Sequence, residues 1–377
     1  MRKASHLLYF MIKIPDITII GGGVIGLLTA RELFKAGATV TVIEKNQLGQ
    51  ESSWAGGGIL LPLYPWRQAD AITRLTLQSL KLYPTLASQL LTDTQKDPEW
   101  TPCGLLITKN PDIDVATQWC KQNQIPFETA TPSWFDNLNT TPHNPLWLPS
   151  IAQARNPRLV KSLIQDLINK GITIIEACEL LDVSIHNQTI TQIHTSKGVM
   201  PVQNLIISAG AWTGELFKKL FPALISHRPE VQPVKGQMLL FDGKPDTLKT
   251  MVLDGDQYLI PRRDGKILAG STVEYNDFNK TISDAAKNKL TDFAYDLMPA
   301  LKEIPLLHHW AGLRPGTADG VPYIDQHPDI SNLSINAGHF RNGLIMGPAS
   351  AQLMVDLILN RPTQVDPTPY KIASRLA

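Results

Sequence analysis

The clearest pattern in the chain lies near its start, where short apolar runs flank a helix-like stretch. Residues 17–20, ITII, are a β-branched run typical of a buried parallel strand. Residues 24–37 place Ile25, Leu28 and Leu33 at helical spacing before Gly37 ends the pattern. A second apolar run, TVTVIE, follows at 39–44. The order of strand, turn, helix and strand predicts the first βαβ unit of a doubly wound α/β domain.

The same alternation returns further along the chain. Residues 71–92 predict a helix with an offset at Pro84, and 104–108 predict a strand. Residues 158–185 repeat helix, glycine stop and strand, and 204–212 predict another buried strand that ends in small residues. We assign the segments at 158–185 and 204–212 to the doubly wound domain as well.

A different pattern occupies the third quarter of the chain. Strands dominate between 231 and 275, and residues 251–273 are predicted to form a hairpin with its turn at Asp264-Gly265. By contrast, 126–157 holds six prolines without a sustained period, which indicates a long surface connection between domains. A helix at 283–297, a strand at 332–338 and a closing helix at 339–359 complete the pattern. The chain therefore predicts an α/β domain joined to an antiparallel-sheet domain.

Length and charge agree with this division. The 377 residues exceed the roughly 250 to 300 at which one core usually splits into two domains. The formal charge is +1, and no block of like charge offers a patch for nucleic acid or an acidic membrane. A small neutral or zwitterionic partner fits better.

The cysteines and the N-terminal residues limit the location. Cys103, Cys120 and Cys178 are far apart and lack CxxC spacing, so we interpret them as free thiols in a reducing compartment and predict no metal site. The apolar stretch at 6–14 is too short to span a bilayer and lacks a cleavage site, and Met1 and Met11 are both candidate starts. A cytoplasmic protein is expected.

Candidate chemistry begins with the glycine cluster. Gly21, Gly23 and Gly26 fit G-x-G-x-x-G, in which the first glycine permits a tight turn, the second lets backbone approach a pyrophosphate, and the third lets helix pack on strand. Glu44 lies about 20 residues further on, where a carboxylate accepts hydrogen bonds from ribose hydroxyls. The pattern predicts an adenine dinucleotide, NAD or FAD, with a purely structural glycine turn as the alternative.

The segment after Glu44 bears on which dinucleotide is bound. A nicotinamide domain would continue to alternate strands and helices, whereas 46–65 reads NQLGQESSWAGGGILLPLYP. Its hydroxyls and glycines are suited to bring backbone against a second, deeper part of the ligand. An ordinary loop remains the alternative.

Seven motifs then occur together in one order: IIGGGVIGLLTA, SSWAGGGIL, IISAGAW, PVKGQML, YLIPRRDGKILAGST, WAGLRPGTADGVPYI and AGHFRNGLIMGPA. In this combination the chain resembles the FAD-dependent amine oxidases of the D-amino-acid oxidase group, and most closely the glycine oxidases of thiamine biosynthesis, from about 16 to 360. The resemblance implies a Rossmann-like FAD-binding domain, assigned to 14–95, 150–230 and 305–377. It assigns an antiparallel-sheet substrate-binding domain to 96–149 and 231–304.

The resemblance also implies cofactor residues. Val24 and Ile25 match the pyrophosphate loop, Glu44 and Lys45 match the ribose acid and its neighbour, and Leu180 matches a backbone contact to adenine. The segment that the family places near the flavin corresponds to Ser52, Ser53, Gly57, Gly58 and Ile59, and the segment around the flavin ring corresponds to His339, Phe340, Arg341, Asn342, Gly343, Leu344 and Ile345. No cysteine lies beyond 178, so non-covalent FAD is expected.

Three residues are implied to bind the substrate. Arg314 matches the carboxylate-binding position, Tyr258 would assist it, and Arg341 would be a second substrate-side residue. A planar guanidinium suits a carboxylate because it donates two parallel hydrogen bonds. The alternatives are that Arg314 pairs with a protein acid such as Asp319, that Tyr258 is ordinary β packing, and that Arg341 is a solvated residue at a helix start.

Other polar residues at these motifs have plainer interpretations. We assign core or capping roles to His308, His309 and His339. The helix start near Asn342 is expected to stabilise negative charge on a reduced flavin.

The activity implied is oxidation of glycine and other small amines, such as sarcosine and small D-amino acids, to the imine or 2-oxo acid. Oxygen would reoxidise the flavin to give H2O2, and the imine would supply thiazole synthesis. A broader D-amino-acid oxidase and a dehydrogenase that reduces a quinone are the alternatives, and a homo-oligomer is expected. Trp54, Gly56 and Val273 depart from the family pattern and leave the size limit of the substrate open.

Overall fold

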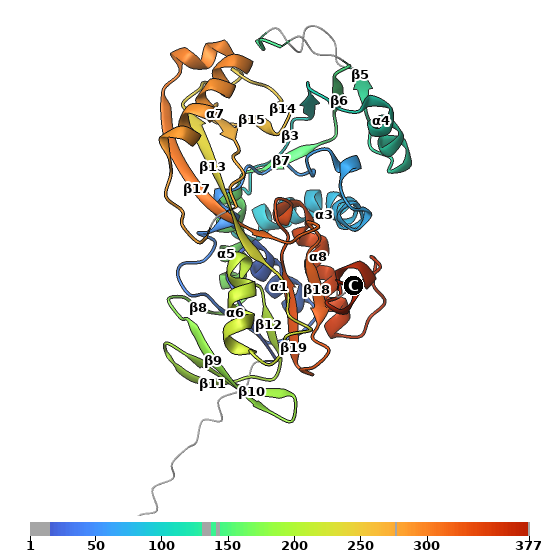
Figure 1. Ribbon diagram of the computed structural model, residues 1–377, viewed down its shortest axis with the longest axis vertical. Helices are drawn as coiled ribbons and strands as arrows, with labels where there is room; N and C mark the ends of the chain where they lie inside the picture. The colour runs from blue at the N-terminus through green and yellow to red at the C-terminus, as the bar shows by residue number, and fades with distance from the viewer. Residues whose placement is uncertain (1–15, 130–136, 141–143, 276, 376–377) are drawn as a thin grey trace, which may run out of the picture.

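Two β-sheets, one of six strands and one of eight, organise the chain. The computed structural model describes residues 16–129, 137–140, 144–275 and 277–375. Figure 1 shows the six-stranded sheet with its helices in the lower part of the molecule, and the eight-stranded sheet in the upper part. The apolar stretch at 6–14 and the candidate starts Met1 and Met11 lie outside the described residues.

The six-stranded sheet has the order β18-β19-β12-β1-β2-β8. Its strands are β1 (Ile17–Ile20), β2 (Val40–Ile43), β8 (Thr173–Ile175), β12 (Leu205–Ile207), β18 (Tyr323–Gln326) and β19 (Leu333–Ala337). All neighbours are parallel except β18 and β19. Helix α1 (Val24–Lys35) connects β1 to the parallel β2, so the predicted βαβ unit is confirmed.

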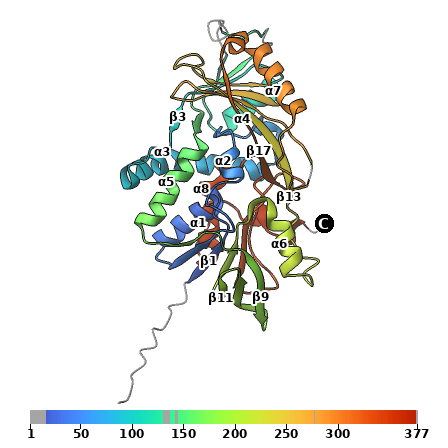
Figure 2. The same cartoon turned by 90° about the vertical axis from the view of Figure 1, so that its left-hand side faces the viewer.

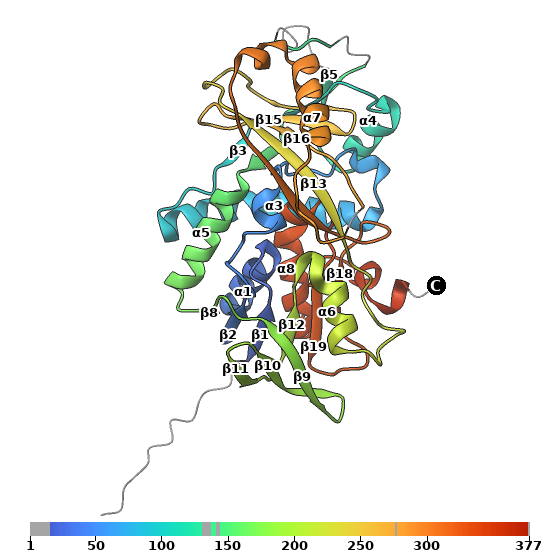
Figure 3. The same cartoon turned by 60° about the vertical axis from the view of Figure 1, so that its left-hand side comes forward.

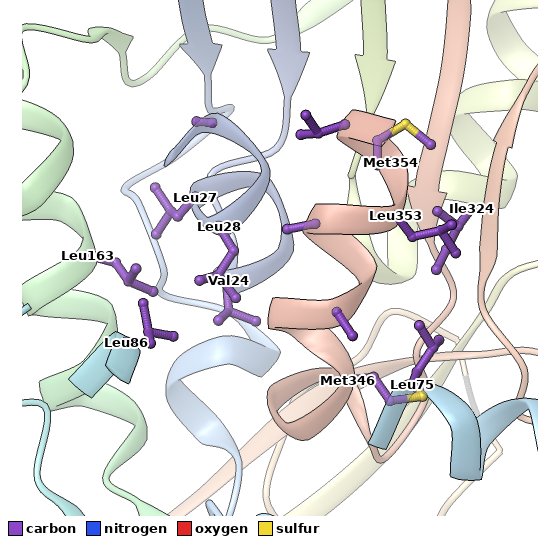
Figure 4. Close-up of a cluster of buried hydrophobic side chains, with 14 of the residues drawn as sticks. Val24, Leu27, Leu28, Leu75, Leu86, Leu163, Ile324, Met346, Leu353 and Met354 are labelled. Atoms are coloured by element: carbon purple, nitrogen blue, oxygen red, sulfur yellow. The ribbon is translucent and has the colours of Figure 1, made fainter. Parts of the chain in front are cut away.

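Helices pack beside this sheet and build the largest core. They include α1, α3 (Asp70–Thr94), α5 (Asn156–Asn169) and α8 (Gly343–Ile358). Figure 4 shows Leu27 and Leu28 of α1 between Leu163 of α5 and the side chains of α8. The helix predicted at 71–92 is confirmed, and Pro84 lies inside a single continuous element. The closing helix begins at Gly343, four residues later than predicted.

The eight-stranded sheet has the order β17-β13-β16-β15-β14-β4-β6-β5. Its strands are β4 (Leu105–Ile107), β5 (Glu128–Thr129), β6 (Leu146–Leu148), β13 (Gln232–Phe241), β14 (Met251–Asp254), β15 (Gln257–Pro261), β16 (Ile267–Gly270) and β17 (Leu306–Gly316). The hairpin turn predicted at Asp264-Gly265 joins β15 to β16. A second hairpin, between β14 and β15, was not predicted. The sheet is antiparallel except for the parallel pair of β14 and β4.

Short elements cover the rest of the chain. They are α2 (Ser52–Ala55), α4 (Ile113–Gln122), α6 (Thr213–Leu220), α7 (Asp284–Leu297), the pair β3 (Trp100–Pro102) and β7 (Ala152–Ala154), and the small sheet of β9 (Leu180–His186), β10 (Thr189–Thr195) and β11 (Gly198–Pro201). Helix α7 packs against residues of β13 and β16, and Figure 2 shows it in the upper part of the molecule.

Two sequence expectations need revision. The described part of 126–157 contains β6 and β7, so this stretch is not simply a surface connection; part of it lies outside the described residues. The boundary predicted at 305 places β17 with the FAD-binding domain, whereas β17 pairs with β13 of the eight-stranded sheet along ten residue pairs. Figure 3 shows these two long strands running together toward the lower part of the molecule. The rest of the domain division remains a prediction.

A buried ion pair joins two of the helices beside the sheet. Arg31 of α1 and Asp166 of α5 are both at most 1% exposed, and Arg31 Nε lies 3.0 Å from the Asp166 carboxylate. Lys170 also donates to that carboxylate. Arg31 also pairs with the less buried Glu32 at 3.1 Å, but Asp166 is its fully buried partner, so this pair should matter far more than a surface pair.

We expect Asp166→Ala to lower the free energy of unfolding by roughly 3–5 kcal/mol, because Arg31 then stays buried without its main counter-charge. The matched control is Lys35→Ala, which removes a more exposed pair with Glu32 and should cost at most about 1 kcal/mol. Urea denaturation of both variants measures the difference. Equal losses would contradict a structural role for the buried pair.

Candidate active site

A cavity of about 880 Å³ lies where the two sheets meet. It begins at the carboxyl ends of β1, β2, β12 and β19, which contribute Gly21, Glu44, Ser208 and Gly338 to its wall. It then extends to side chains of β13, β15 and β17. Ligands of doubly wound sheets bind beyond the carboxyl ends of the strands, so the first part of the cavity has the position expected for a dinucleotide.

The glycine fingerprint shapes the turn between β1 and α1. Gly21 has φ +114°, and a Cβ there would lie 2.3 Å from the Ser208 carbonyl oxygen. A Cβ on Gly26 would lie 2.0 Å from the Gly21 carbonyl oxygen, so the absence of a side chain lets the helix approach the strand. Gly26 itself does not line the cavity. Gly23 lines the cavity directly before α1, which has no side-chain cap of its own at Gly23. The helix start is therefore suited to bind an anion.

Glu44 is fixed at the edge of this turn. One carboxylate oxygen accepts from Gly22 N at 2.8 Å and the other accepts from Asn46 N at 2.9 Å. The side chain remains in the cavity wall, beside Lys45, which pairs with Glu179 at 3.0 Å. This arrangement leaves Glu44 lone pairs for the hydroxyl donors of a ribose.

The glycine and serine segment after Glu44 also forms the wall. Ser53 Oγ accepts from Val24 N at 2.9 Å, which ties the segment to the start of α1. Gly57 and Gly58 face β15 and β7: a Cβ on Gly57 would lie 3.1 Å from Tyr258, and one on Gly58 would lie 2.0 Å from the Ala154 carbonyl oxygen. The segment is therefore a tightly packed part of the cavity wall, and the interpretation as an ordinary surface loop is wrong.

Arg262 forms a hydrogen bond to this segment. Its guanidinium is buried, donates to the Gly57 carbonyl at 2.8 Å, and also donates to Gln153 Oε1. Burial, and to a smaller extent the neighbouring Arg155, lower the pKa of Arg262 to about 10. The sequence analysis did not identify Arg262, because its contact with Gly57 joins residues 205 positions apart.

Arg314 lies in the cavity wall at the substrate-side end. Nη1 donates to the carbonyls of Lys235 and Thr272 at 3.3 and 3.1 Å, and Nη2 donates to Ser271 Oγ at 2.8 Å. None of the ion pairs within the described ranges includes Arg314, so the predicted alternative of a pair with Asp319 is wrong. Burial, and to a smaller extent the nearby Arg341, lower the pKa of Arg314 to about 10. Both causes favour an anionic ligand.

Glycines leave space for this guanidinium. Gly236 lies diagonally across from Arg314 on the neighbouring strand, and a Cβ there would come within 2.2 Å of Nη2. Tyr258 is buried beside it, with its hydroxyl 3.5 Å from Met238 Sδ, and both side chains line the cavity. Tyr258 therefore faces the same space as Arg314, which simple β packing does not require.

The turn before α8 closes another side of the cavity. The residues from His339 to Leu344, which belong to this turn and to the first turn of α8, line the wall, whereas Ile345 is buried in the core and does not. Phe340 has φ +46°, and buried His339 shares a hydrogen bond with Ser350 Oγ at 3.0 Å. Arg341 is only partly exposed and lines the cavity, so the interpretation as a solvated residue is not supported.

The structure therefore brings together every predicted site residue except Gly26 and Ile345, and it also places Leu180 and Ile59 in the wall. His308 and His309 lie outside this wall, and His308 is exposed, so it is not the core residue expected; His339 is buried and lines the cavity. Trp54 packs edge-on against Trp310 at 5.7 Å and does not line the cavity. Val273 also lies outside the wall. Of the three departures from the family pattern, only Gly56 lines the cavity.

Three wall residues that the sequence analysis missed have buried polar atoms without partners in the described structure. They are Asn156 Oδ1, Ser208 Oγ and Asn336 Oδ1, on side chains at most 6% exposed. An unpaired buried polar atom is costly unless a ligand or water completes its hydrogen bonds. Together with the start of α1 and Glu44, these atoms fit a large polar cofactor such as FAD.

The described residues contain neither a candidate membrane span nor a candidate metal site. Over the described ranges, no helix has the length and apolar character needed to cross a membrane. In the same part of the chain, no cluster of three or more His, Cys, Asp or Glu side chains could hold a metal ion.

Substitution of Arg262 tests whether its hydrogen bond to Gly57 shapes the FAD site. We expect Arg262→Ala to raise the Kd for FAD about tenfold, since the Gly57 carbonyl loses a charged donor and the segment shifts. The adjacent Arg263 is the matched control, because it is exposed and bonds to Asp97 and Thr101 instead. Titration of flavin-free protein with FAD gives both constants. An unchanged Kd in Arg262→Ala would show that the bond to Gly57 does not shape the site.

Known proteins were compared with this chain. It is 41% identical to a glycine oxidase of Pseudomonas aeruginosa, over 96% of this chain and 99% of that protein. It is 29% identical to a bifunctional protein ThiO/ThiG of Synechocystis sp., over 92% of this chain and 52% of that protein. The crystal structure of glycine oxidase from Geobacillus kaustophilus matches with a TM-score of 0.88 and 26% identity, covering 95% of this chain and 98% of that one.

A family model agrees with these relatives and with the geometry of the cavity. The model described as DAO, FAD dependent oxidoreductase, matches residues 16–357, which include both sheets and the whole cavity wall. The predicted fold, a Rossmann-like domain with a second sheet domain, and the predicted cofactor are confirmed. The chain belongs to the DAO family of FAD-dependent oxidoreductases.

Proposed function

We propose that the chain oxidises glycine to its imine, and accepts other small amines such as sarcosine and small D-amino acids. The observation that carries the proposal is Arg314, a guanidinium in the cavity wall with no carboxylate of the described chain in ion-pair distance. The glycine oxidases among the relatives support the same substrate.

Arg314 would hold the substrate carboxylate. Three of its N–H directions are fixed by Lys235, Thr272 and Ser271, so the fork cannot rotate freely and its remaining donors have a defined direction. A carboxylate bound in two places is oriented as well as held, which is what an oxidation at the neighbouring carbon requires. Tyr258 would donate a further hydrogen bond, and Arg341 would add positive charge.

The cofactor would occupy the rest of the cavity. Its phosphates would lie at the start of α1, its ribose at Glu44, and its flavin between the Gly57 segment and the turn before α8. FAD, when bound, supplies the two-electron oxidation of the amine. Gly57, Gly58 and the backbone at Gly343 would exclude water and position the flavin, and none of the three cysteines lines the cavity.

Electron and proton balance define the products. The amine and O2 yield the imine and H2O2, and water then converts free glycine imine to glyoxylate and ammonia. The relative that combines ThiO with ThiG in one chain supports a further fate, in which the imine supplies thiazole synthesis. The cytoplasmic location and the homo-oligomer expected from the sequence remain predictions.

The alternatives differ in substrate and in electron acceptor. A broader D-amino-acid oxidase would oxidise D-alanine and D-proline faster than glycine. A dehydrogenase would reduce a quinone and release no peroxide with O2. Comparing peroxide formation from these three amino acids, with and without an added quinone, separates the proposals.

Release of the flavin tests how the cofactor is held. Because no cysteine reaches the cavity, acid precipitation should leave a colourless pellet and a yellow supernatant. Absorption spectra of both fractions measure this result. Colour retained by the washed pellet would show a covalent bond and contradict the proposal.

The carboxylate role of Arg314 has its own test. We expect Arg314→Ala to lower kcat/KM for glycine and sarcosine by about 2–5 kcal/mol in free-energy terms, because the bound carboxylate loses its partner. Arg314→Lys keeps the charge without the planar fork and should restore only part of the loss. Steady-state rates of peroxide formation, normalised to flavin content, measure both variants.

Arg74→Ala is the matched control, because Arg74 is exposed and pairs with Asp70 on α3. It should leave kcat/KM unchanged. An Arg314→Ala enzyme with full flavin content and wild-type kcat/KM would show that Arg314 does not bind the substrate carboxylate.

A further inference from the structure

Helix α8 contains a proline close to the cavity. Pro348 has no backbone N–H, so it cannot donate to the carbonyl of Leu344 four residues earlier. Leu344 lies in the first turn of α8 and lines the cavity. The proline therefore removes a hydrogen bond from the turn that faces the cofactor space.

Tyr83 of α3 supplies a donor at that position. Its side chain is 2% exposed, and its hydroxyl donates to the Leu344 carbonyl at 2.5 Å. Burial raises the pKa of Tyr83, so the hydroxyl keeps its proton at any physiological pH. A buried carbonyl without a donor would cost roughly 1–3 kcal/mol, which this bond avoids.

A second bond on the same face of α3 supports the region beyond the proline. Ser79, one turn before Tyr83, accepts from Ala349 N at 3.1 Å. Residues four apart lie on one face of a helix, so α3 contacts α8 with one donor before Pro348 and one acceptor after it. Figure 4 shows Leu75 of α3 beside Met346 of α8, in the same contact between the two helices.

We propose that Tyr83 is a positioning residue of the active site, which replaces the N–H missing at Pro348 and thereby fixes the first turn of α8 against the cofactor. The inference rests on the placement of FAD in the proposed function. A helix start stabilises negative charge only where its N–H groups are held in direction, and reduced flavin carries such charge. Tyr83 thus acts through Leu344 without touching the substrate.

A double-mutant cycle tests this. Tyr83→Phe should raise the Kd for FAD about fivefold to tenfold and shift the midpoint potential of the bound flavin to more negative values. Pro348→Ala provides an N–H for Leu344, so adding Tyr83→Phe to it should change the Kd less than twofold and leave the potential unchanged. FAD titration of flavin-free protein and spectroelectrochemistry measure the four proteins without any substrate.

Tyr370→Phe is the matched control. Tyr370 is fully buried and also donates to a backbone carbonyl, that of Ala71 at 2.7 Å, yet neither residue lines the cavity. Its loss should lower the melting temperature and leave the Kd and the potential unchanged.

Two results would overturn the inference. In the first, Tyr83→Phe lowers only the thermal stability. In the second, Tyr83→Phe changes the Kd and the potential equally in the wild-type protein and in the Pro348→Ala variant. If Tyr83→Phe alone does not fold, Pro348→Ala and the double variant still have to match in Kd and potential. A wild-type protein that binds FAD but does not oxidise glycine would contradict the proposed function. The double-mutant cycle would still test the role of Tyr83, because it measures Kd and potential without substrate.

Discussion

An uncompensated cation in the wall of the cavity is the constraint on which the site depends. Arg314 donates to two carbonyls and one hydroxyl, and none of the ion pairs in the described part of the chain neutralises it. Burial and the nearby Arg341 depress its pKa, which measures how unfavourable the charge is without a ligand. A small anion that enters the cavity would relieve this cost, and we propose that the charge selects substrates with a carboxylate.

Contacts between other elements position this cation relative to the cofactor space. The long pair of β13 and β17 sets Gly236 beside the guanidinium, where any side chain would displace it. Arg262 fixes the Gly57 segment on one side, and α3 fixes the start of α8 on the other. The two ends of the cavity thus depend on contacts between elements far apart in sequence, which explains why both sheets are needed for one site.

Sequence reasoning identified what is encoded locally. The βαβ unit and the roles of Gly21 and Gly26 follow from spacing alone, because each glycine acts within one turn. Arg314 was found through a motif resemblance, since its isolation from carboxylates is a tertiary property. Arg262 could not be found, because a buried arginine and an exposed one such as Arg263 have the same local pattern. The second hairpin and the strands within 126–157 were missed because short strands have weak periodicity.

The central claim is that a small amino acid bound at Arg314 reduces a flavin in the same cavity. Anaerobic addition of glycine to the purified protein tests it in one step, since oxygen cannot restore the oxidised flavin. With one equivalent of glycine per flavin, the account predicts that the visible absorption of oxidised flavin disappears and returns when air is admitted, with one H2O2 formed per flavin. A flavin that stays oxidised with glycine, sarcosine and D-alanine, yet is reduced by dithionite, would contradict it.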